Sequence, residues 1–571
     1  MKNQLVADVL YQIADLLDLK GEIFFKTRAY RIAAQTIEVL DEDIALVTKE
    51  KRLREISGVG EALAKKITEL VETGKLEYFE RLKKEIPKEL LIMLEIPGLG
   101  HKKVAALYKN LGIKTIEQLR NACLNEKVRS LDGFGEITEK NILRGILMKE
   151  KTSGRVLLNV ASEDGNNYIK YLKDCDKIIR LSLAGSLRRM KETIGDLDIL
   201  ASSKNPDHVM KYFVNYPDVQ RVLLKGSTKT SVILNDELQV DLRVVEDKSF
   251  GAALQYFTGS KEHNVKMRSL AIKKGYKLNE YGLFDKETDK FISGKDEEEI
   301  YNRLGLSYIP PELRENRGEI KSASKKKIPK LVEYNDIQGD LHVHSSWSDG
   351  AESIETIANH CKKKGYEYVG ITDHSQSLWV ARGLSEERVV KKIREIEKIN
   401  KKMDDFRVFC GTECDIKSDS SLDYPDKILK KFDYVGIGIH TTFKMTSKEI
   451  TDRIIQGMEN EHVMFLAHPT CRLIGRREPF DLDIERIFEA AKQTDTRMEI
   501  NSFPDRLDLN SNHSKIAKDK GIGFVIGTDA HYLNHLDFMK YGIATARRGW
   551  LEKKDILNTL SLKQIEKNLL R

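Results

Sequence analysis

The chain of 571 residues is too long for one hydrophobic core, so its length predicts several domains. Its 40% hydrophobic and 32% charged residues are typical of a globular protein, and no run approaches the roughly 20 apolar residues that span a bilayer; we expect a cytoplasmic protein without a membrane partner. The net charge of +7 permits an anionic partner without requiring one, and the six cysteines show no disulfide or CxxC spacing, which favours a reducing compartment.

Three segments of the N-terminal part repeat one glycine pattern. An apolar residue, any residue, glycine, an apolar residue and a second glycine precede a helix-forming stretch in ISGVGEALAKKI (56–67), IPGLGHKKVAAL (96–107) and LDGFGEITEKNIL (131–143). Glycine tolerates positive φ, and free N–H groups at a helix start bind phosphate oxygens. One copy could be a plain turn between helices. Three copies resemble the helix-hairpin-helix motif, which implies contact with the DNA backbone at Gly58, Gly60, Gly98, Gly100, Gly133 and Gly135.

A carboxylate pattern follows in LAGSLRRMKETIGDLDIL (183–200). Asp196 and Asp198 stand two residues apart on a predicted strand, so both side chains leave the same face about 7 Å apart. A third carboxylate, Asp241, lies in the alternating strand ELQVDLRVV (237–245). Such oxygen ligands suit Mg²⁺, and two ions can activate a 3′-hydroxyl and stabilise departing pyrophosphate. Exposed strands also carry Asp-x-Asp without any such role, but the whole set with the preceding Gly-Ser predicts nucleotidyl transfer.

Residues 250–284, FGAALQYFTGSKEHNVKMRSLAIKKGYKLNEYGLF, closely resemble the family X DNA polymerases, typified by DNA polymerase beta. The resemblance covers residues 1–315 and implies a lyase-like domain, fingers, palm and thumb, with Asp196, Asp198 and Asp241 as the triad for Mg²⁺ or Mn²⁺. It also implies a triphosphate contact, a segment against the nucleotide sugar, a residue near the incoming base and one near the template. These are Gly185, Ser186 and Arg189; Tyr256, Phe257 and Gly259; Asn264; and Arg268. Phe257 could instead be core, and Arg268 a solvated helix residue.

Two positions depart from the family pattern. Lys66 falls on the Schiff-base position of relatives with a catalytic lyase domain, but a second family lysine is Ala62 here, so a DNA-contacting Lys66 is the alternative. An arginine commonly found two residues before the third aspartate is Gln239. We expect this change to slow the chemistry without abolishing it.

The histidines are concentrated in the C-terminal part, where ten of the thirteen lie after residue 340. In GDLHVHSSWSDG (339–350), His342 and His344 flank Val343 on a predicted strand, which alone could be a solvated strand end. Further apolar runs also end in histidine or a carboxylate, with helical segments between them. Such alternation predicts a β/α barrel that gathers a site at its strand ends.

The collected residues resemble the metal-binding set of PHP domains, named for polymerase and histidinol phosphatase. That set is His342, His344, Asp349, His374, Glu413, His440, His468, Asp529 and His531. Nine ligands imply two or three Mn²⁺ or Zn²⁺ ions, which would generate a hydroxide for attack on a phosphodiester. Arg472, Arg476 and Arg477, after His468, could grip a DNA phosphate or lie on an exposed loop.

Together these patterns predict a multidomain α+β and α/β chain. We expect a lyase-like helical domain (1–85), fingers (86–150), a nucleotidyltransferase-type palm (151–246), a thumb (247–315), a Lys- and Ser-rich linker (316–334) and a distorted β/α barrel of PHP type (335–571). The resemblance implies a monomeric polymerase that uses dNTPs on gapped or primed duplex DNA, fills short gaps in base excision repair, and carries a 3′–5′ exonuclease and an abasic-site endonuclease in the barrel. The alternatives are a nucleotidyltransferase acting on RNA ends, a fused small-molecule phosphatase and a structural metal-binding module.

Overall fold

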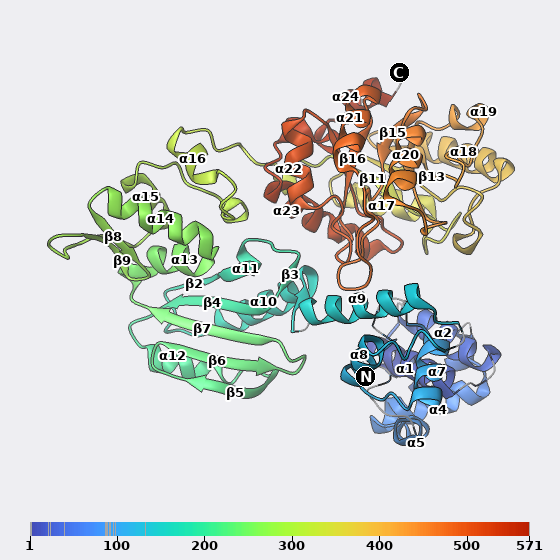
Figure 1. Cartoon of the computed structure of the whole chain (residues 1–571), viewed down its shortest axis with the longest axis horizontal. Helices are drawn as coiled ribbons and strands as arrows, with labels where there is room; N and C mark the ends of the chain where they lie inside the picture. Colours follow the sequence, from blue (N-terminus) through green and yellow to red (C-terminus); the bar gives the residue numbers. More distant parts are fainter. Residues whose placement is uncertain are drawn as a thin grey trace. The chain divides into compact units, whose positions relative to one another are not determined.

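A computed structural model describes residues 3–569, except 21, 23, 39, 41, 57, 86–89, 91–92, 95, 97–98, 132 and 153. The chain divides into two compact units (Figure 1). One consists of residues 1–153 with 475–477, and the other of residues 154–474 with 478–571.

The regular elements described between residues 3 and 152 of the first unit are helices. Its helices include α1 (Asn3–Lys20), α2 (Phe24–Glu38), α3 (Ile44–Lys49), α4 (Glu61–Thr73), α5 (Glu77–Glu85), α7 (His101–Leu111), α8 (Ile116–Leu124) and α9 (Glu136–Thr152). Apolar residues spaced three or four apart, such as Val6, Leu10 and Leu17 on α1, form one face of each helix and build a common core. Thr115 closes the start of α8 with a capping box to Gln118.

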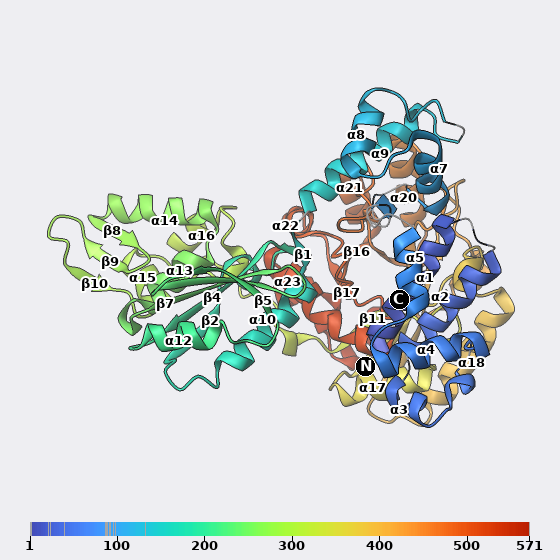
Figure 2. The same cartoon turned by 90° about the horizontal axis from the view of Figure 1, so that it is seen from below.

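The second unit begins with a mixed sheet within residues 180–245, all of which are described. Its order is β2 (Arg180–Leu183), β4 (Asp196–Ser202), β7 (Gln239–Val245), β6 (Lys229–Leu234) and β5 (Val219–Lys225), and only β4 and β7 pair in parallel. Leu197 and Ile199 of β4 pack towards α10 (Leu158–Leu172) and α12 (Pro206–Phe213), while Leu200 packs towards α13 (Phe250–Thr258). Figure 2 shows the sheet edge-on between these helices.

A small α+β segment follows the mixed sheet. It consists of α13, α14 (Lys261–Lys273), the antiparallel strands β8 (Tyr276–Asn279), β9 (Gly282–Asp285) and β10 (Phe291–Ser293), and α15 (Glu297–Arg303). Glu297 and Arg314 form a buried ion pair at 2.6 Å. The predicted linker 316–334 is packed rather than loose, because Glu319 at the start of α16 (Glu319–Ser324) is fully buried against His263 at 2.7 Å.

Seven parallel strands then run in chain order within the fully described stretch 339–527. They are β11 (Gly339–Val343), β12 (Tyr368–Ile371), β13 (Arg407–Asp415), β14 (Tyr434–Gly438), β15 (Val463–Leu466), β16 (Arg497–Asn501) and β17 (Phe524–Gly527). Helices alternate with them, including α17 (Ile354–Lys363), α18 (Glu386–Asn400), α20 (Ser447–Met458), α21 (Ile484–Thr494) and α22 (Ser511–Asp519). A bridge between Val343 and Ala530 joins the first strand to the segment after the last. The predicted β/α barrel and the overall fold class are confirmed.

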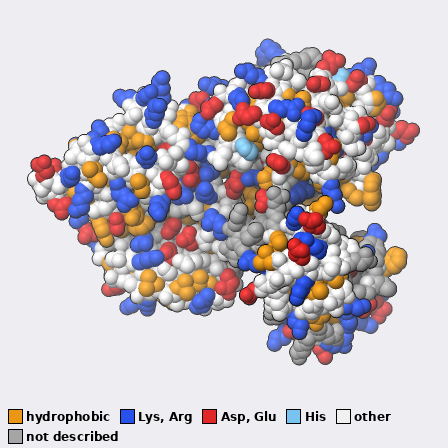
Figure 3. All heavy atoms as spheres, in the orientation of Figure 1, with side chains coloured by type: hydrophobic (Ala, Val, Ile, Leu, Met, Phe, Trp, Pro, Cys, Tyr) orange, Lys and Arg blue, Asp and Glu red, His pale blue; other side chains and the backbone are white. Residues whose placement is uncertain are grey.

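Three further observations concern the whole chain. The six cysteines, all among the described residues, are buried, and no disulfide joins them. No helix in the described part of the chain combines the length and apolarity that crossing a bilayer requires. On the face seen in Figure 3, basic and acidic side chains are interspersed. Contacts to an anionic partner on that face therefore depend on local groups rather than on one broad basic patch.

Candidate active sites

The parallel pairing of β4 and β7 gathers the predicted catalytic carboxylates. Asp198 stands directly opposite Asp241, and Asp196 stands opposite Gln239. Asp196 and Asp198 alternate with the buried Leu197, so both carboxylates leave one face of the sheet. Asp196 and Asp198, which are close in sequence, therefore lie near the distant Asp241 on one face of the sheet.

The electrostatics around these three carboxylates favour a bound cation. Burial and the carboxylates of Asp196 and Asp241 raise the pKa of Asp198 to about 7, and burial with Asp241 also raises the pKa of Asp196. Burial opposes ionisation of Asp241 as well, but hydrogen bonds from Lys229, Gln239 and Ser231 outweigh it and lower its pKa. Crowded oxygen ligands of this kind fit Mg²⁺ or Mn²⁺, whose charge would relieve their mutual repulsion.

Gly185 allows the chain to pass close to the Asp198 carboxylate. Its φ is +61°, and a Cβ added there would overlap the carboxylate of Asp198. Any side chain at this position would therefore displace Asp198 and adopt a strained backbone conformation.

Two other predicted nucleotide contacts, Arg189 and Asn264, are hydrogen-bonded to neighbouring residues. Arg189 donates to Glu315 at 3.1 Å and to the Thr258 carbonyl, so an ion pair engages the side chain expected to meet the triphosphate. Asn264 donates to the Tyr256 carbonyl at 2.7 Å and thereby fixes the end of α13.

The aromatic pair near this helix end is half-buried, and Phe257 packs against a core cluster that includes Phe250 and Leu254. The Tyr256 and Phe257 rings meet edge to face at 5.1 Å, and the guanidinium of Arg243 lies 4.3 Å from the centre of the Phe257 ring. Gly259 follows with φ +69°, and Arg268 is exposed on α14. Because it is exposed, Arg268 is accessible to a template strand. A solvated helix residue without such a contact would be exposed in the same way.

The glycine repeats of the first unit build turns that lead into helices. Gly58 and Gly133 have φ of +84° and +79°. Gly60 and Gly100 are the N-cap residues of α4 and α7, and Gly135 directly precedes α9. Gly98 lies outside the described residues. Backbone N–H groups at these helix starts are suited to phosphate oxygens.

Lys66, on α4 of the same unit, has an environment that favours a neutral amine. Its Nζ lies 4.8 Å from the centre of the Tyr78 ring and 5.9 Å from that of Tyr30. Burial and the nearby Lys26 lower the pKa of Lys66. Lys26 is thus one neighbour that lowers the pKa of Lys66, while Ala62 stands where a second lysine is expected.

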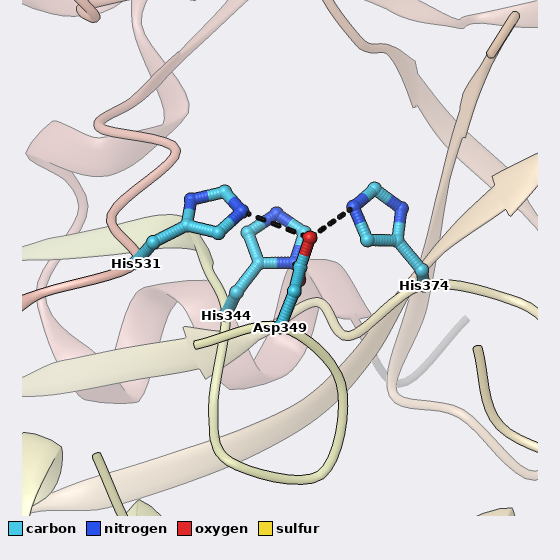
Figure 4. Close-up of side chains that lie close together, drawn as sticks. All are labelled: His344, Asp349, His374 and His531. Carbon is cyan, nitrogen blue, oxygen red and sulfur yellow. Dashed lines mark ion pairs between the residues drawn. The ribbon is translucent and has the colours of Figure 1, made fainter. Parts of the chain in front are cut away.

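The barrel brings all nine predicted metal ligands together at the carboxyl ends of its strands. In chain order the nine are His342 and His344 at β11, Asp349 beyond it, His374 after β12, Glu413 on β13, His440 after β14, His468 after β15, and Asp529 and His531 after β17. Figure 4 shows Asp349 between His374 and His531, with His344 beside it. The distances from Asp349 to Nε2 of these two rings are 3.6 and 3.4 Å.

The ligand atoms form three overlapping groups among the described barrel residues, each with atoms within 4.8 Å of one another. The groups are His344, Asp349, His374 and His531; His342, His344 and Asp529; and His374, Glu413 and His440. Glu413 also lies 2.6 Å from Nε2 of His468. Three groups that share members agree with a metal-binding cluster.

The donor atoms are poised for metal. Nε2 of His342, both ring nitrogens of His344, Nδ1 of His374 and Oδ1 of Asp349 are buried without a hydrogen-bond partner. Burying such atoms unpaired is costly, so they fit divalent ions. Burial opposes the charged forms, yet Glu413 raises the pKa of His440 to about 9, while the imidazoles around Glu413 hold its own pKa well below the usual range.

Carboxylates outside the predicted set orient these imidazoles. Oε1 of Glu499, on β16, lies 2.6 Å from Nδ1 of His342, and its other oxygen accepts from the His468 backbone N–H. Asp415 lies 3.3 Å from Nδ1 of His440. Such partners fix the ring that presents its other nitrogen to a metal. Their sequence contexts, RMEIN and GTECDI, resemble ordinary strands, so no local signal distinguishes them.

Two basic residues that the sequence analysis did not single out also lie at these sites. Lys229 on β6 lies 2.7 Å from Oδ2 of Asp241. Arg506 lies 3.6 Å from Asp529, and one of its buried terminal nitrogens has no partner. Arg472, by contrast, is not free to grip DNA, because it pairs with Glu192 at 2.8 and 3.0 Å and is largely buried.

Comparison with known proteins agrees with both sites. Residues 1–76 match the helix-hairpin-helix domain, 90–146 the SAM-like helix-hairpin-helix tandem, 253–315 the DNA polymerase beta thumb and 340–503 the PHP domain. The chain is 40% identical over 573 residues to "DNA polymerase/3'-5' exonuclease PolX" of Bacillus subtilis (strain 168), with 100% of both chains covered. The chain belongs to the family X DNA polymerases with a C-terminal PHP domain.

Two further relatives each match only part of this family X polymerase. DNA polymerase lambda of Rattus norvegicus is 24% identical over 343 residues, which cover 55% of this chain and 56% of the relative. A probable phosphatase of Acetivibrio thermocellus is 29% identical over 201 residues, which cover 34% of this chain and 78% of the relative. The predicted family is confirmed.

Proposed function

We propose that this family X polymerase adds deoxynucleotides to the 3′ end of a primer at short gaps during base excision repair, and that its barrel removes nucleotides from 3′ ends. The register that sets Asp198 beside Asp241 carries the polymerase half. The overlapping ligand groups carry the nuclease half. The full-length similarity to the Bacillus subtilis PolX supports both halves.

In the polymerase half, Asp196, Asp198 and Asp241 would hold Mg²⁺ or Mn²⁺. Such ions, when bound, activate the 3′-hydroxyl and neutralise the triphosphate. Gly185, Ser186 and Arg189 would bind the triphosphate of the dNTP, after Arg189 releases Glu315. Tyr256, Phe257 and Gly259 would lie against the sugar, where a 2′-hydroxyl would be excluded. Asn264 would face the base, and Arg268 the template.

In the barrel, the nine ligands would hold two or three Mn²⁺ or Zn²⁺ ions. Such ions, when bound, polarise a phosphodiester and make water nucleophilic at neutral pH. The chain itself positions the imidazoles through Glu499 and Asp415 and buries the centre beneath the barrel rim. We propose that the protein acts as a monomer, with the helix-hairpin-helix glycines on the DNA backbone and Lys66 as a Schiff-base amine for abasic sites.

The test uses a gapped duplex with a labelled primer, Mn²⁺ and the purified protein, with and without dNTPs. The double variant Asp196→Ala/Asp198→Ala should lose extension and keep primer degradation. The double variant His342→Ala/His344→Ala should lose degradation and keep extension. Degradation that survives in the second variant would assign the nuclease elsewhere, and extension on single strands without a template would favour a template-independent transferase.

The small-molecule phosphatase remains a second candidate for the barrel because of the partial relative named a probable phosphatase. Release of phosphate from a soluble monoester, without loss of primer length, would favour it. Primer degradation by the wild-type protein, without release of phosphate from the monoester, would exclude it.

A further inference from the structure

Trp379 is strongly exposed next to the barrel centre. It is 79% exposed, and Val380 beside it is 66% exposed. The other two tryptophans are held by the fold: the Trp347 indole donates to Glu395 at 3.0 Å, and Trp550 is 8% exposed. No other large apolar side chain in the described part of the chain is more exposed than Trp379. Contiguous exposed apolar surface rimmed by polar residues is typical of interaction sites, and Trp379 and Val380 are neighbours in the chain.

Trp379 lies on a loop that starts and ends at a metal ligand. Residues 375–384 follow His374 directly and return to it, because the Leu384 N–H donates to the His374 carbonyl at 2.9 Å. A turn in which the Leu378 N–H donates to the Ser375 carbonyl precedes the ring. Such a turn keeps its end Cα atoms within about 7 Å, and one more residue adds about 3.8 Å. The Cα atom of Trp379 therefore lies within about 11 Å of that of Ser375, the residue that follows the ligand His374.

The loop is held firmly. Asp423 accepts from the Ser377 N–H at 2.7 Å and, through its carbonyl, from the Gln376 side chain at 3.0 Å. A Cβ at Gly383 would overlap the Ser375 carbonyl, so the two arms of the loop are closely packed. A fixed loop presents the ring without the entropy cost of ordering it on binding.

A second loop of similar chemistry starts at a neighbouring ligand, His440. Phe443, 39% exposed, stands in TTFKMT (441–446), directly after the ligand His440. The His374 and His440 rings are 5.1 Å apart, and both contact Glu413. Each loop combines an aromatic ring with an exposed cation, Arg382 or Lys444, and neither contains an acidic residue. Aromatic rings interleaved with cations are typical of surfaces that bind single-stranded nucleic acid.

We propose that Trp379 and Phe443, with Arg382 and Lys444, hold the unpaired 3′-terminal nucleotides of a DNA strand, with Trp379 stacked on a base. The inference rests on the proposed hydrolysis of DNA ends by the barrel. Bases in a duplex are already stacked on their neighbours and cannot reach the indole. The surface therefore selects frayed or mismatched 3′ ends and directs them to the metal centre.

The test compares Trp379→Ala, Trp379→Phe and Ile516→Ala as full-length, metal-loaded proteins. Ile516 is an exposed apolar residue on α22, 38% exposed, and serves as the matched control. Loss of one base stack should raise KM for a single-stranded oligonucleotide about 5- to 150-fold in Trp379→Ala. Trp379→Phe should retain most of the affinity, and Ile516→Ala all of it. Hydrolysis of bis(p-nitrophenyl) phosphate, a diester without bases, should be equal in all four proteins.

A second measurement isolates the stacking contact. An oligonucleotide whose last nucleotides are abasic should bind the wild type more weakly than the normal strand, and Trp379→Ala should bind both equally. An unchanged KM in Trp379→Ala, or a difference between the two strands that persists in it, would overturn the proposal. So would loss of the small-diester activity, because the loop would then only support the centre. A wild type that hydrolyses the small diester and no DNA would instead refute the proposed nuclease function on which the inference rests.

Discussion

Lys229 Nζ lies 2.7 Å from Oδ2 of Asp241, while the Gln239 side chain donates to Oδ1 of the same carboxylate at 2.8 Å. Gln239, where the family resemblance implies an arginine, is neutral, and the neighbouring strand β6 supplies a cation. Lys229 thus pairs with the third carboxylate of the proposed triad, and this contact would lessen the effect expected from Gln239.

Replacement of Lys229 by alanine should therefore lower kcat for gap filling about 10- to 100-fold, the size of a lost charge-assisted hydrogen bond, with little change in KM for the dNTP. If Lys229 stands in for the missing arginine, Gln239→Arg should restore much of the activity to Lys229→Ala. Lys225→Ala, on the exposed strand β5, is the control. Failure of the rescue would mean that Lys229 acts in some other way.

Gly185→Ala should lower polymerase activity about 100-fold, because the new Cβ displaces the Asp198 carboxylate and catalysis is sensitive to shifts of about 1 Å. Gly275→Ala is a matched control, since Gly275 also has positive φ, +79°, but nothing within 4 Å of an added Cβ. Both variants should lose about 1 kcal/mol of unfolding free energy through backbone strain. Only the first should lose extension in a primer assay, and primer degradation should be normal in both.

Glu499→Gln should weaken metal binding in the barrel about 10- to 100-fold, because a neutral amide orients and polarises His342 less well than a carboxylate. Titration with Mn²⁺, followed by electron paramagnetic resonance, would measure the change separately from turnover. Glu355→Gln, which alters an exposed glutamate of α17, should leave the titration unchanged. Full Mn²⁺ affinity in Glu499→Gln would remove it from the supporting network.

Lys66→Ala should abolish trapping of the protein on an abasic site by borohydride, whereas Lys65→Ala, which removes an exposed lysine paired with Glu61, should not. The lowered pKa of Lys66 makes more of the amine neutral at a given pH, so the trapping rate should rise with pH and level off below the range of an ordinary lysine. Lys26→Met removes one cause of the lowered pKa and should move this profile to higher pH. Equal trapping by wild type and Lys66→Ala would leave Lys66 with a DNA contact only.

The sequence was sufficient for the ligands that end apolar strands, because residue type, position and neighbours all point to one use. His342 and Asp529 are examples, whereas Asp196 and Asp198 at the start of β4 and Asp241 within β7 were predicted from their spacing and strand pattern. Glu499, Lys229 and Trp379 could not be found in this way. Their roles arise from tertiary neighbours, and each sits in a local pattern shared by ordinary strand or loop residues. The packing of the predicted linker could not be found in this way either, since Glu319 is buried against a residue distant in sequence, His263.

Closure of the barrel between its first strand and the segment after its last has a consequence for biosynthesis. His342 and His344 emerge from the ribosome well before Asp529 and His531, yet the same centre requires all four. Domains fold from the N-terminus as they are made. A nascent chain, or one truncated before Asp529, therefore cannot assemble the complete centre, and DNA degradation awaits completion of the polypeptide.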